Sequence, residues 1–175
     1  MLGRIKDLSK KELGYIIGLF IGDGYLCHDK KHRHYRVEFH LNSEKNKDII
    51  SYVEYLLYKL KQNSNKLKDK RGNSIRLYFY SKELMFFIKK EIKDIKKKKL
   101  TKDYKLGLLS GFIDAEGWVI KGDIVVCQKK KSTINFFRKL AQDLNVRGKL
   151  WKAKSYGKGG PVWRLRIPTR FKYLP

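Results

Sequence analysis

A short pattern that occurs twice along the chain constrains its fold more than any other feature. Residues 13–24 read LGYIIGLFIGDG and residues 106–117 read LGLLSGFIDAEG, and the two copies align without a gap. Each copy is mostly apolar and ends in an acidic residue followed by glycine, with Asp23 in the first copy and Glu116 in the second. Self-similarity of this kind indicates a duplicated structural unit. We therefore expect two similar halves related by a pseudo-two-fold axis.

The acid that closes each copy is unusual in an apolar segment, because an ionised carboxylate is costly to bury unless something compensates it. A core helix whose acidic end reaches water would explain one copy. An acid at the same place in both copies favours a bound positive charge. Asp114 differs, because Ile21 fills its place in the first copy. Asp114 therefore does not belong to the repeated feature.

Small residues recur every four positions along both copies. Residues four apart share a face of a helix. Glycine weakens a helix by about 1 kcal/mol relative to alanine, so we expect the close approach of a second helix to offset this loss. A transmembrane pairing motif is excluded, because the apolar stretch is too short and is flanked by charge. The predicted helix–helix interface consists of Gly14, Gly18, Gly22, Gly107, Gly111 and Ala115.

Strand-like and helix-like patterns follow each copy in the same order. Residues 35–41 alternate, with apolar and aromatic residues on one face and Arg36, Glu38 and His40 on the other, which is the period of a half-buried strand. Residues 123–128 occupy the same place in the second half. Helical spacing marks 49–60, 84–95 and 134–144, and a second pair of matching strands spans 75–80 and 163–168.

Each half therefore reads as helix, hairpin, helix, hairpin, with a last helix evident only in the first half. The expected fold class is α+β, a duplicated αββαββ(α) unit whose two antiparallel sheets each turn an apolar face to the helices. We divide the chain into an N-terminal half (1–95), a basic linker (96–103) and a C-terminal half (104–175). The lysine run at 96–99 is expected to be a solvated charge run.

The formal net charge of +25, from 42 basic and 17 acidic residues, favours an extended polyanion as the partner. A lysine-rich thermophile surface would carry matching glutamates, whereas lysine is unbalanced here. No long apolar run predicts a membrane segment. Two cysteines, Cys27 and Cys127, are too few for a disulfide framework. We therefore expect a cytoplasmic protein with no membrane contact.

The polar faces of the predicted strands are rich in arginine, lysine and tyrosine. Side chains on strands can enter the major groove of DNA and meet base edges. Arginine suits guanine, and lysine suits phosphate. The residues that we expect to contact DNA are Arg33, Arg36, Glu38, His40, Asn42, Arg71, Arg76, Tyr78, Tyr80, Lys121, Lys152, Lys154, Lys158, Arg164 and Arg166.

Residues 16–24 (IIGLFIGDG) and 109–117 (LSGFIDAEG) resemble the two signature motifs of single-chain LAGLIDADG homing endonucleases, in particular compact archaeal intron-encoded members. The resemblance covers nearly the whole chain, because the hairpins and helices recur in the family's order. It implies that two sheets form a DNA-binding saddle. It also implies a monomer that cuts both strands of a long, asymmetric DNA site by metal-dependent phosphodiester hydrolysis. The cut leaves short 3′ overhangs and starts the mobility of the chain's own intron.

The resemblance also implies where the chemistry takes place. The last acid of each motif, Asp23 and Glu116, would point into the DNA minor groove and share a metal site with Gly22 and Ala115. A divalent ion would relieve the repulsion between the acids and their unfavourable position at helix C-termini. Hard oxygen ligands suit Mg²⁺, or Mn²⁺ in its place, and we expect Ca²⁺ to bind without supporting efficient cleavage. The metal would activate the attacking water and stabilise the leaving oxygen.

In this family, residues at the end of the first hairpin of each half assist the water and the phosphate. In the second half this place holds Gln128 and Lys129, and Lys129 could stabilise charge on the phosphate. In the first half it holds Leu41 and Asn42, so we expect the two half-sites to be chemically unequal. A lysine that relatives carry just after the second motif is absent, and Lys121 is the candidate to replace it.

Other candidate sites carry less information. Cys27, His28, His32 and His34 cluster after the first motif, but their spacing matches no zinc-finger pattern. We favour a loop that faces solvent or the DNA backbone. The segment 155–160 (SYGKGG) lacks the strand, helix and Lys-Ser/Thr ending of a P-loop, and it is interpreted as a hairpin loop.

Two other functions fit the same fold. An RNA-binding maturase would help its host intron fold through the same basic sheets, so the host intron RNA is an alternative partner. A DNA-binding regulator would keep the fold without the chemistry. The two acids favour cleavage, because binding alone would not need two carboxylates that repel phosphate. Because the sequence starts at Met1 without flanking splicing residues, we do not expect an intein.

Overall fold

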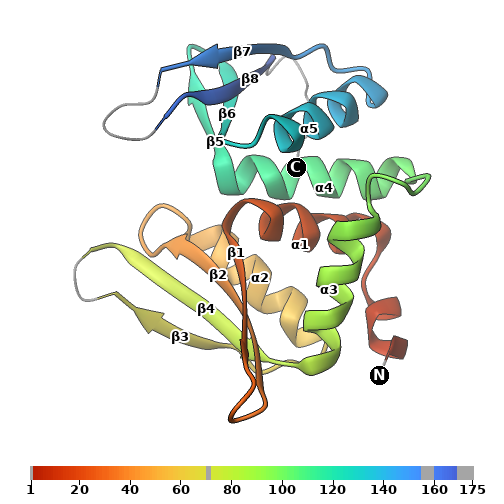
Figure 1. Cartoon of the computed structure of the whole chain (residues 1–175), viewed down its shortest axis with the longest axis vertical. Coiled ribbons are helices and arrows are strands. Elements are labelled where there is room, and N and C mark those ends of the chain that lie inside the picture. The colour runs from red at the N-terminus through yellow and green to blue at the C-terminus, as the bar shows by residue number, and fades with distance from the viewer. Residues whose placement is uncertain (1, 70–71, 155–159, 169–175) are drawn as a thin grey trace.

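The computed structural model describes residues 2–69, 72–154 and 160–168, and its two halves have the same order of elements (Figure 1). A short 3-10 helix, η1 (Leu2–Asp7), precedes them. The first half contains α1 (Lys10–Asp23), β1 (Gly24–Asp29), β2 (His34–Asn42), α2 (Lys47–Lys59), β3 (Asn65–Lys68), β4 (Ser74–Tyr80) and α3 (Lys82–Asp94). The second half contains α4 (Lys102–Glu116), β5 (Gly117–Ile120), β6 (Asp123–Gln128), α5 (Lys131–Asp143), β7 (Lys149–Ala153) and β8 (Val162–Pro168). Within the described residues, α3 has no counterpart in the second half.

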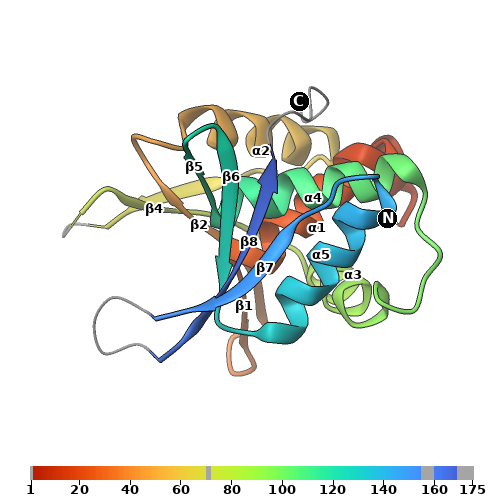
Figure 2. The same ribbon diagram turned by 90° about the horizontal axis from the view of Figure 1, so that it is seen from above.

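Each half forms one antiparallel sheet. The strand order is β1-β2-β4-β3 in the first half and β5-β6-β8-β7 in the second. The registers correspond as well, because Gly24 pairs with Phe39 at the place where Gly117 pairs with Val126. Figure 1 shows α1 and α4 side by side at the centre, with one sheet to each side of them, and Figure 2 shows the same elements from above. The predicted duplication and the α+β class are therefore confirmed.

The two repeated helices pack against each other through their small residues. A Cβ atom added at Gly18 would overlap a backbone carbonyl oxygen of α4, and one added at Gly111 would overlap a backbone carbonyl oxygen of α1. Gly14 and Gly107 face the opposite backbone in the same way. The predicted interface is therefore confirmed, and its backbones lie too close for any side chain between them. Over the described part of the chain, no helix is long and apolar enough to cross a membrane.

The apolar faces of the sheets cover the helices. In β2, Val37, Phe39 and Leu41 are buried, as the alternation of residues 35–41 predicts. In the second half, Phe112 of α4 stacks on Phe137 of α5 with ring centroids 3.6 Å apart, and both side chains are fully buried. This core fixes the C-terminal ends of α1 and α4 relative to the sheets.

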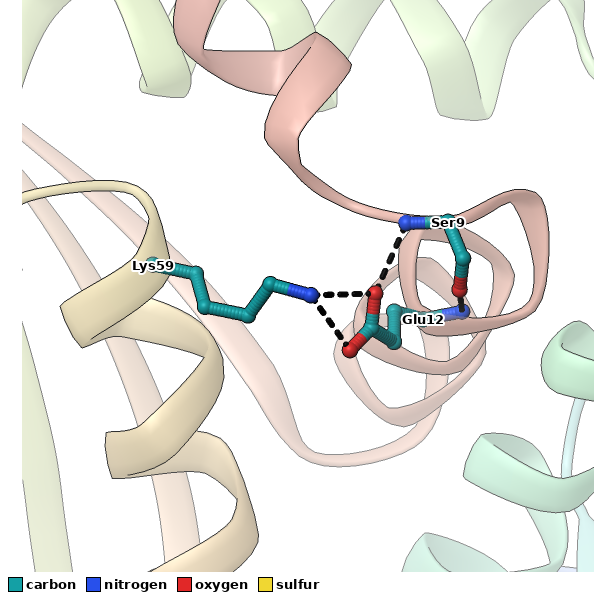
Figure 3. Close-up of polar contacts among 3 residues, drawn as sticks. All are labelled: Ser9, Glu12 and Lys59. Atoms are coloured by element: carbon teal, nitrogen blue, oxygen red, sulfur yellow. Dashed lines mark hydrogen bonds and ion pairs between the residues drawn. The ribbon is translucent and has the colours of Figure 1, made fainter.

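A group of three polar residues defines the start of α1. The Ser9 hydroxyl accepts the backbone N–H of Glu12 at 3.1 Å, and the Glu12 carboxylate accepts the backbone N–H of Ser9 at 2.7 Å (Figure 3). This is a capping box. Lys59, at the end of α2, donates to both oxygens of the same carboxylate at 2.8 and 2.9 Å. The contact ties the end of α2 to the start of α1.

The connection between the halves is partly built into the fold. Thr101 is the N-cap of α4, so the last residues of the expected linker 96–103 are already helical. Lys98 pairs with Glu91 at 2.5 Å, and the buried Glu91 also accepts a hydrogen bond from the Tyr104 hydroxyl at 3.0 Å. The lysines at 96–99 are exposed, as predicted for a solvated charge run, and Lys98 also neutralises a carboxylate that would be costly to bury alone.

Candidate active site and nucleic-acid interface

Asp23 and Glu116 lie at equivalent places, at the C-terminal ends of the paired helices α1 and α4. The chain leaves each helix through a glycine in extended conformation, Gly24 or Gly117, whose N–H still donates to a helix carbonyl. A Cβ atom at either glycine would overlap atoms of the helical turn before it. The glycine therefore lets a strand start at once, and it places the acid at the junction of helix and sheet.

The two acids approach each other across the helix pair. A Cβ atom at Gly22 would overlap the Cβ of Ala115 and lie 3.0 Å from the Cγ of Glu116. Burial raises the pKa of Asp23 to about 6. Burial, and then the neighbouring Asp23 carboxylate, raise the pKa of Glu116 to about 7, against a hydrogen bond from Gln128 that lowers it. Near neutral pH, the pair can therefore lose its protons to solvent when a cation binds the two carboxylates.

The end of the helix pair is a negative region in a chain with a formal net charge of +25. Neither α1 nor α4 has a basic residue in its last turn. The last carbonyls of a helix lack intrahelical partners and carry partial negative charge. The available donors are thus two carboxylates and the carbonyls of Gly22 and Ala115, as the resemblance implies. Mg²⁺ usually takes one or two carboxylates and completes its shell with water and phosphate oxygens, so these residues fit such an ion.

The histidines of the first hairpin do not form a metal centre. Among the described residues, no group of three or more histidine, cysteine, aspartate and glutamate side chains could hold a metal ion. His32 Nδ1 instead lies 2.7 Å from Asp29 Oδ2, and His28 stacks on Tyr35 with ring centroids 4.5 Å apart. This arrangement fits the loop that the sequence favours over a zinc site.

The two halves differ next to their acids. The Gln128 amide, at the end of β6, donates to Glu116 Oε1 at 2.7 Å. The same register position in β2 is Leu41, which is 3% exposed in the core. Lys129 follows Gln128 and is exposed. Glu116 therefore has a side-chain hydrogen-bond donor at a position that is apolar in the first half.

Three predicted contacts are placed differently by the structure. Glu38 is 2% exposed between two basic side chains of its own strand, so the prediction that it contacts DNA is wrong. Asn42 uses its side-chain oxygen to accept two backbone N–H groups of the β2–α2 turn. Lys121 lies in the β5–β6 turn with a φ of 48°, beyond the end of β5 that is distant from α4. Lys121 is thus separated from Glu116 by the length of β5, and its role in place of the missing lysine stays a prediction.

Most other predicted DNA contacts lie on the outward faces of the sheets, opposite the buried residues. In the first sheet these are Arg36, His40, Arg76, Tyr78 and Tyr80, and in the second they are Arg164 and Arg166. Lys152 is an exception, because it pairs with Trp163, which packs against the core, and so projects from the helix-facing side of β7. Arg33 and Lys154 lie at strand ends, whereas Arg71 and Lys158 lie outside the described residues.

Three outward-facing aromatic residues are absent from the predicted contacts. Tyr25 pairs with Glu38 and is 56% exposed. Trp118 lies under the Arg164 guanidinium, 5.7 Å from ring centroid to Cζ, and Trp151 pairs with Arg164 from the neighbouring strand. Their strands are too short to show an alternating pattern of their own. Aligning these short strands with their longer, alternating neighbours could have identified the three aromatic residues as outward-facing.

A polar contact also joins the two repeated helices. The Tyr15 hydroxyl of α1 donates to the Asp114 carboxylate of α4 at 2.7 Å. The corresponding residues of the other copy, Leu108 and Ile21, are apolar. Asp114 thus has a partner of its own, separate from the pair of acids at the helix ends.

Models of LAGLIDADG families match both halves of the chain. The model of the LAGLIDADG DNA endonuclease family matches residues 13–112, and the model of a LAGLIDADG-like domain matches residues 103–171. Uncharacterized protein MJ0398 of Methanocaldococcus jannaschii is 28% identical over 155 residues, which are 86% of this chain and 55% of that protein. The chain therefore spans about half the length of this relative.

Solved structures of the homing endonuclease I-DmoI have the same fold. Its complex with DNA and Ca aligns with a TM-score of 0.73 at 23% identity, over 92% of this chain and 84% of that chain. A structure of its mesophilic variants aligns with a TM-score of 0.73 at 22% identity, over 92% of this chain and 90% of that chain. With the family model spanning residues 13–112 and an acid closing each motif, this chain belongs to the LAGLIDADG DNA endonuclease family and carries one motif in each half.

Proposed function

We propose that this chain is a sequence-specific homing endonuclease that cuts both strands of a long, asymmetric DNA duplex with a divalent metal ion, leaving short 3′ overhangs. The observation that carries the proposal is the convergence of Asp23 and Glu116, one from each half, at the ends of the paired helices. One acid for each strand is what a double-strand break needs. A protein that only bound nucleic acid would gain nothing from this negative pair.

The two sheets would hold the duplex. Their outward faces carry arginine and tyrosine side chains, and strands can place such side chains in the major groove. The two faces differ in sequence, so the DNA site need not be palindromic. Because one chain supplies both acids, we propose that the monomer is the active form.

The residues at the helix ends would divide the chemistry among them. Asp23 and Glu116 would be ionised above about pH 7 and hold a divalent cation with backbone carbonyls beside them. Bound Mg²⁺ or Mn²⁺ would supply Lewis-acid chemistry at the water and the scissile phosphate. Gln128 would keep the Glu116 carboxylate oriented through its 2.7 Å hydrogen bond. The exposed Lys129 would stabilise the charge that develops on the phosphate.

Relatives of the same fold support the choice of partners. I-DmoI structures have been determined in complex with DNA and Ca, and in complex with DNA and Mn. We propose double-stranded DNA and divalent ions for this chain as well. Mg²⁺ or Mn²⁺ would support cleavage, and Ca²⁺ would support binding alone.

A plasmid cleavage assay tests the proposal. The plasmid carries the intron-less allele of the host gene, in which the two exons are joined, and is incubated with Mg²⁺, Mn²⁺ or Ca²⁺. Asp23→Asn and Glu116→Gln are compared with the wild type. Asp114→Asn is the matched control, because it removes the same charge from the same helix as Glu116→Gln while keeping an oxygen that can accept the Tyr15 hydroxyl.

We expect the wild type and Asp114→Asn to linearise the plasmid with Mg²⁺ or Mn²⁺. Asp23→Asn and Glu116→Gln should bind the site and lose double-strand cleavage. Sequencing the ends of the linear product tests the 3′ overhangs. Binding by the wild type without cleavage in any metal would contradict the proposal and indicate a regulator. Preferred binding of the host intron RNA in that case would indicate a maturase.

A further inference from the structure

A carboxylate lies buried on the outward face of the first sheet, where the proposed DNA would bind. Glu38 is 2% exposed in the middle of β2, although its cross-strand neighbours Tyr25 and Tyr78 lie on the outward face. A buried carboxylate is costly unless it is compensated. On a surface that meets phosphates, it also repels the partner. The position therefore calls for an explanation in its immediate surroundings.

Two side chains of the same strand compensate the carboxylate. Arg36 Nε lies 2.6 Å from Glu38 Oε1, and His40 Nε2 lies 3.2 Å from Glu38 Oε2. Residues two apart in a strand share a face, so Arg36, Glu38 and His40 form a row along the outward face. The carboxylate stands in the middle of this row and uses one oxygen for each basic neighbour.

Aromatic rings restrict the two basic groups further. The Arg36 guanidinium lies 5.5 Å from the centroid of the Tyr78 ring, and the His40 ring meets the Tyr25 ring edge-on with centroids 6.2 Å apart. Arg36 and His40 nevertheless remain 31% and 48% exposed. Glu38 engages Nε of Arg36, whereas bidentate recognition of guanine can use the terminal amino groups. Both basic side chains are thus oriented and still accessible to a ligand.

The second sheet has no equivalent carboxylate. The strand registers place Val125 where the first sheet has Glu38, and Asp123 where it has Arg36. Asp123 lies at the end of its strand and pairs with Arg166, which is 45% exposed. The buried carboxylate is therefore a feature of the first half alone, and the fold does not require it.

We propose that Glu38 is a positioning residue that sets base selectivity in one half of the DNA site. It holds Arg36 for bidentate hydrogen bonding to guanine O6 and N7, and it holds His40 towards the edge of an adjacent base. Its charge also weakens binding to DNA that does not offer these base contacts. The inference rests on the proposed function and assigns the selectivity of its first half-site to this row of three residues.

Binding to single-base-pair variants of the cleaved site tests the inference. Glu38→Gln, Arg36→Lys and Glu83→Gln are compared with the wild type on each variant in Ca²⁺, and on an unrelated duplex. Glu83 is exposed in the first turn of α3, so Glu83→Gln makes the same charge change outside the row. Thermal unfolding confirms that each variant is folded.

We expect Glu38→Gln to lose about tenfold discrimination at adjacent base pairs of one half-site. It should also bind the unrelated duplex more tightly than the wild type, because a negative charge has left the DNA-facing surface. Loss of a merely structural residue would weaken binding to both duplexes. Arg36→Lys keeps the charge but loses the bidentate geometry, so it should relax the same base pairs. Glu83→Gln should keep the wild-type profile.

Wild-type selectivity in Glu38→Gln would overturn the inference, and so would relaxation of different base pairs in Arg36→Lys. If Glu38→Gln does not fold, Arg36→Lys decides alone, and unchanged selectivity in that variant overturns the inference. A wild-type protein that neither cuts nor prefers any duplex would remove the proposed function and this inference together. Selective cleavage by the wild type, with unaltered selectivity in Glu38→Gln, would remove only the inference.

Discussion

The two halves of the chain share a backbone but give their acids different surroundings. In the second half, Gln128 donates a hydrogen bond to Glu116, whereas the same position of the first half is the buried Leu41. The pKa of Glu116 is raised to about 7 and that of Asp23 to about 6. Duplication has kept the packing that aligns the helix ends, while side chains around them differ. We therefore expect the two acids to act on the two DNA strands at different rates.

The largest effect should come from the feature that the halves share. Gly18→Ala and Gly111→Ala each place a carbon atom where a carbonyl oxygen of the opposite helix lies. We expect each to lower the free energy of unfolding, measured by urea denaturation, by more than about 3 kcal/mol. Gly72→Ala is the control, because a Cβ there would have no neighbour within 4 Å. Markedly unequal losses in the two helices would contradict a symmetric interface.

The second-largest effect should come from the different surroundings of Asp23 and Glu116, and it shows whether that difference matters for cleavage. Gln128→Leu makes the second half resemble the first and removes the hydrogen bond that lowers the pKa of Glu116. This pKa should rise above about 7, so cutting of one strand should slow severalfold at about pH 6.5 and recover at about pH 8.5. Supercoiled plasmid should accumulate as nicked circles at the lower pH. Gln142→Leu, at an exposed position of α5, is the control. Equal slowing of both strands would argue against unequal acids.

A third effect concerns stability and pH. The folded pKa values of Asp23 and Glu116, about 6 and about 7, exceed the ordinary 3.8 and 4.5. The folded state therefore binds more protons than the unfolded state in this window, and the free energy of unfolding falls as pH rises through about 7. The double variant Asp23→Asn/Glu116→Gln has no carboxyl group at either position, so its stability does not fall in this way. Its melting temperature should therefore exceed that of the wild type at about pH 8 and equal it at about pH 4. The benefit of Glu116→Gln alone should set in at a higher pH than that of Asp23→Asn. A benefit that does not vary with pH would show that the acids titrate normally.

The smallest effect compares the starts of the two repeated helices. α1 has the reciprocal contacts of Ser9 and Glu12, whereas Thr101 of α4 only accepts the N–H of Tyr104 at 3.3 Å. Ser9→Ala should therefore cost about 1 kcal/mol of unfolding free energy, and Thr101→Ala less.

Partial burial raises the pKa of Glu12, but hydrogen bonds from Lys59 and Ser9 lower it overall. The Glu12 contribution should be present above its ordinary pKa of 4.5 and disappear as pH falls through the lowered value. Urea denaturation of Glu12→Gln and of the wild type, above pH 4.5 and again below the lowered pKa, checks this. A loss of unfolding free energy in Glu12→Gln that persists at the acidic pH would contradict it.

Most of the fold could be predicted because two signals agree, the gapless repeat and the alternation of the longer strands. Helix starts are less visible: α2, α3 and α5 each begin a few residues before their first apolar position, since polar first turns carry no apolar pattern. The acids of the site could be identified because they recur. The burial of Glu38 could not, because alternation assigns a face to a residue and does not reveal ion pairs formed on that face. Which face of the sheet Lys152 occupies depends on how the edge strand β7 is aligned with β8. A strand as short as β7 does not reveal that alignment in its sequence.

The packing of α1 against α4 also determines how the chain could be divided. Each helix covers the glycine-lined backbone of the other, so a separated half would leave that backbone and its apolar neighbours in water. Only the segment between the C-cap Ile95 and the N-cap Thr101 joins the halves. A chain cleaved within this segment should behave as two fragments that fold by binding each other, with a melting temperature that rises with protein concentration. The intact chain avoids this dependence, because the connection keeps each half at a high effective concentration near the other.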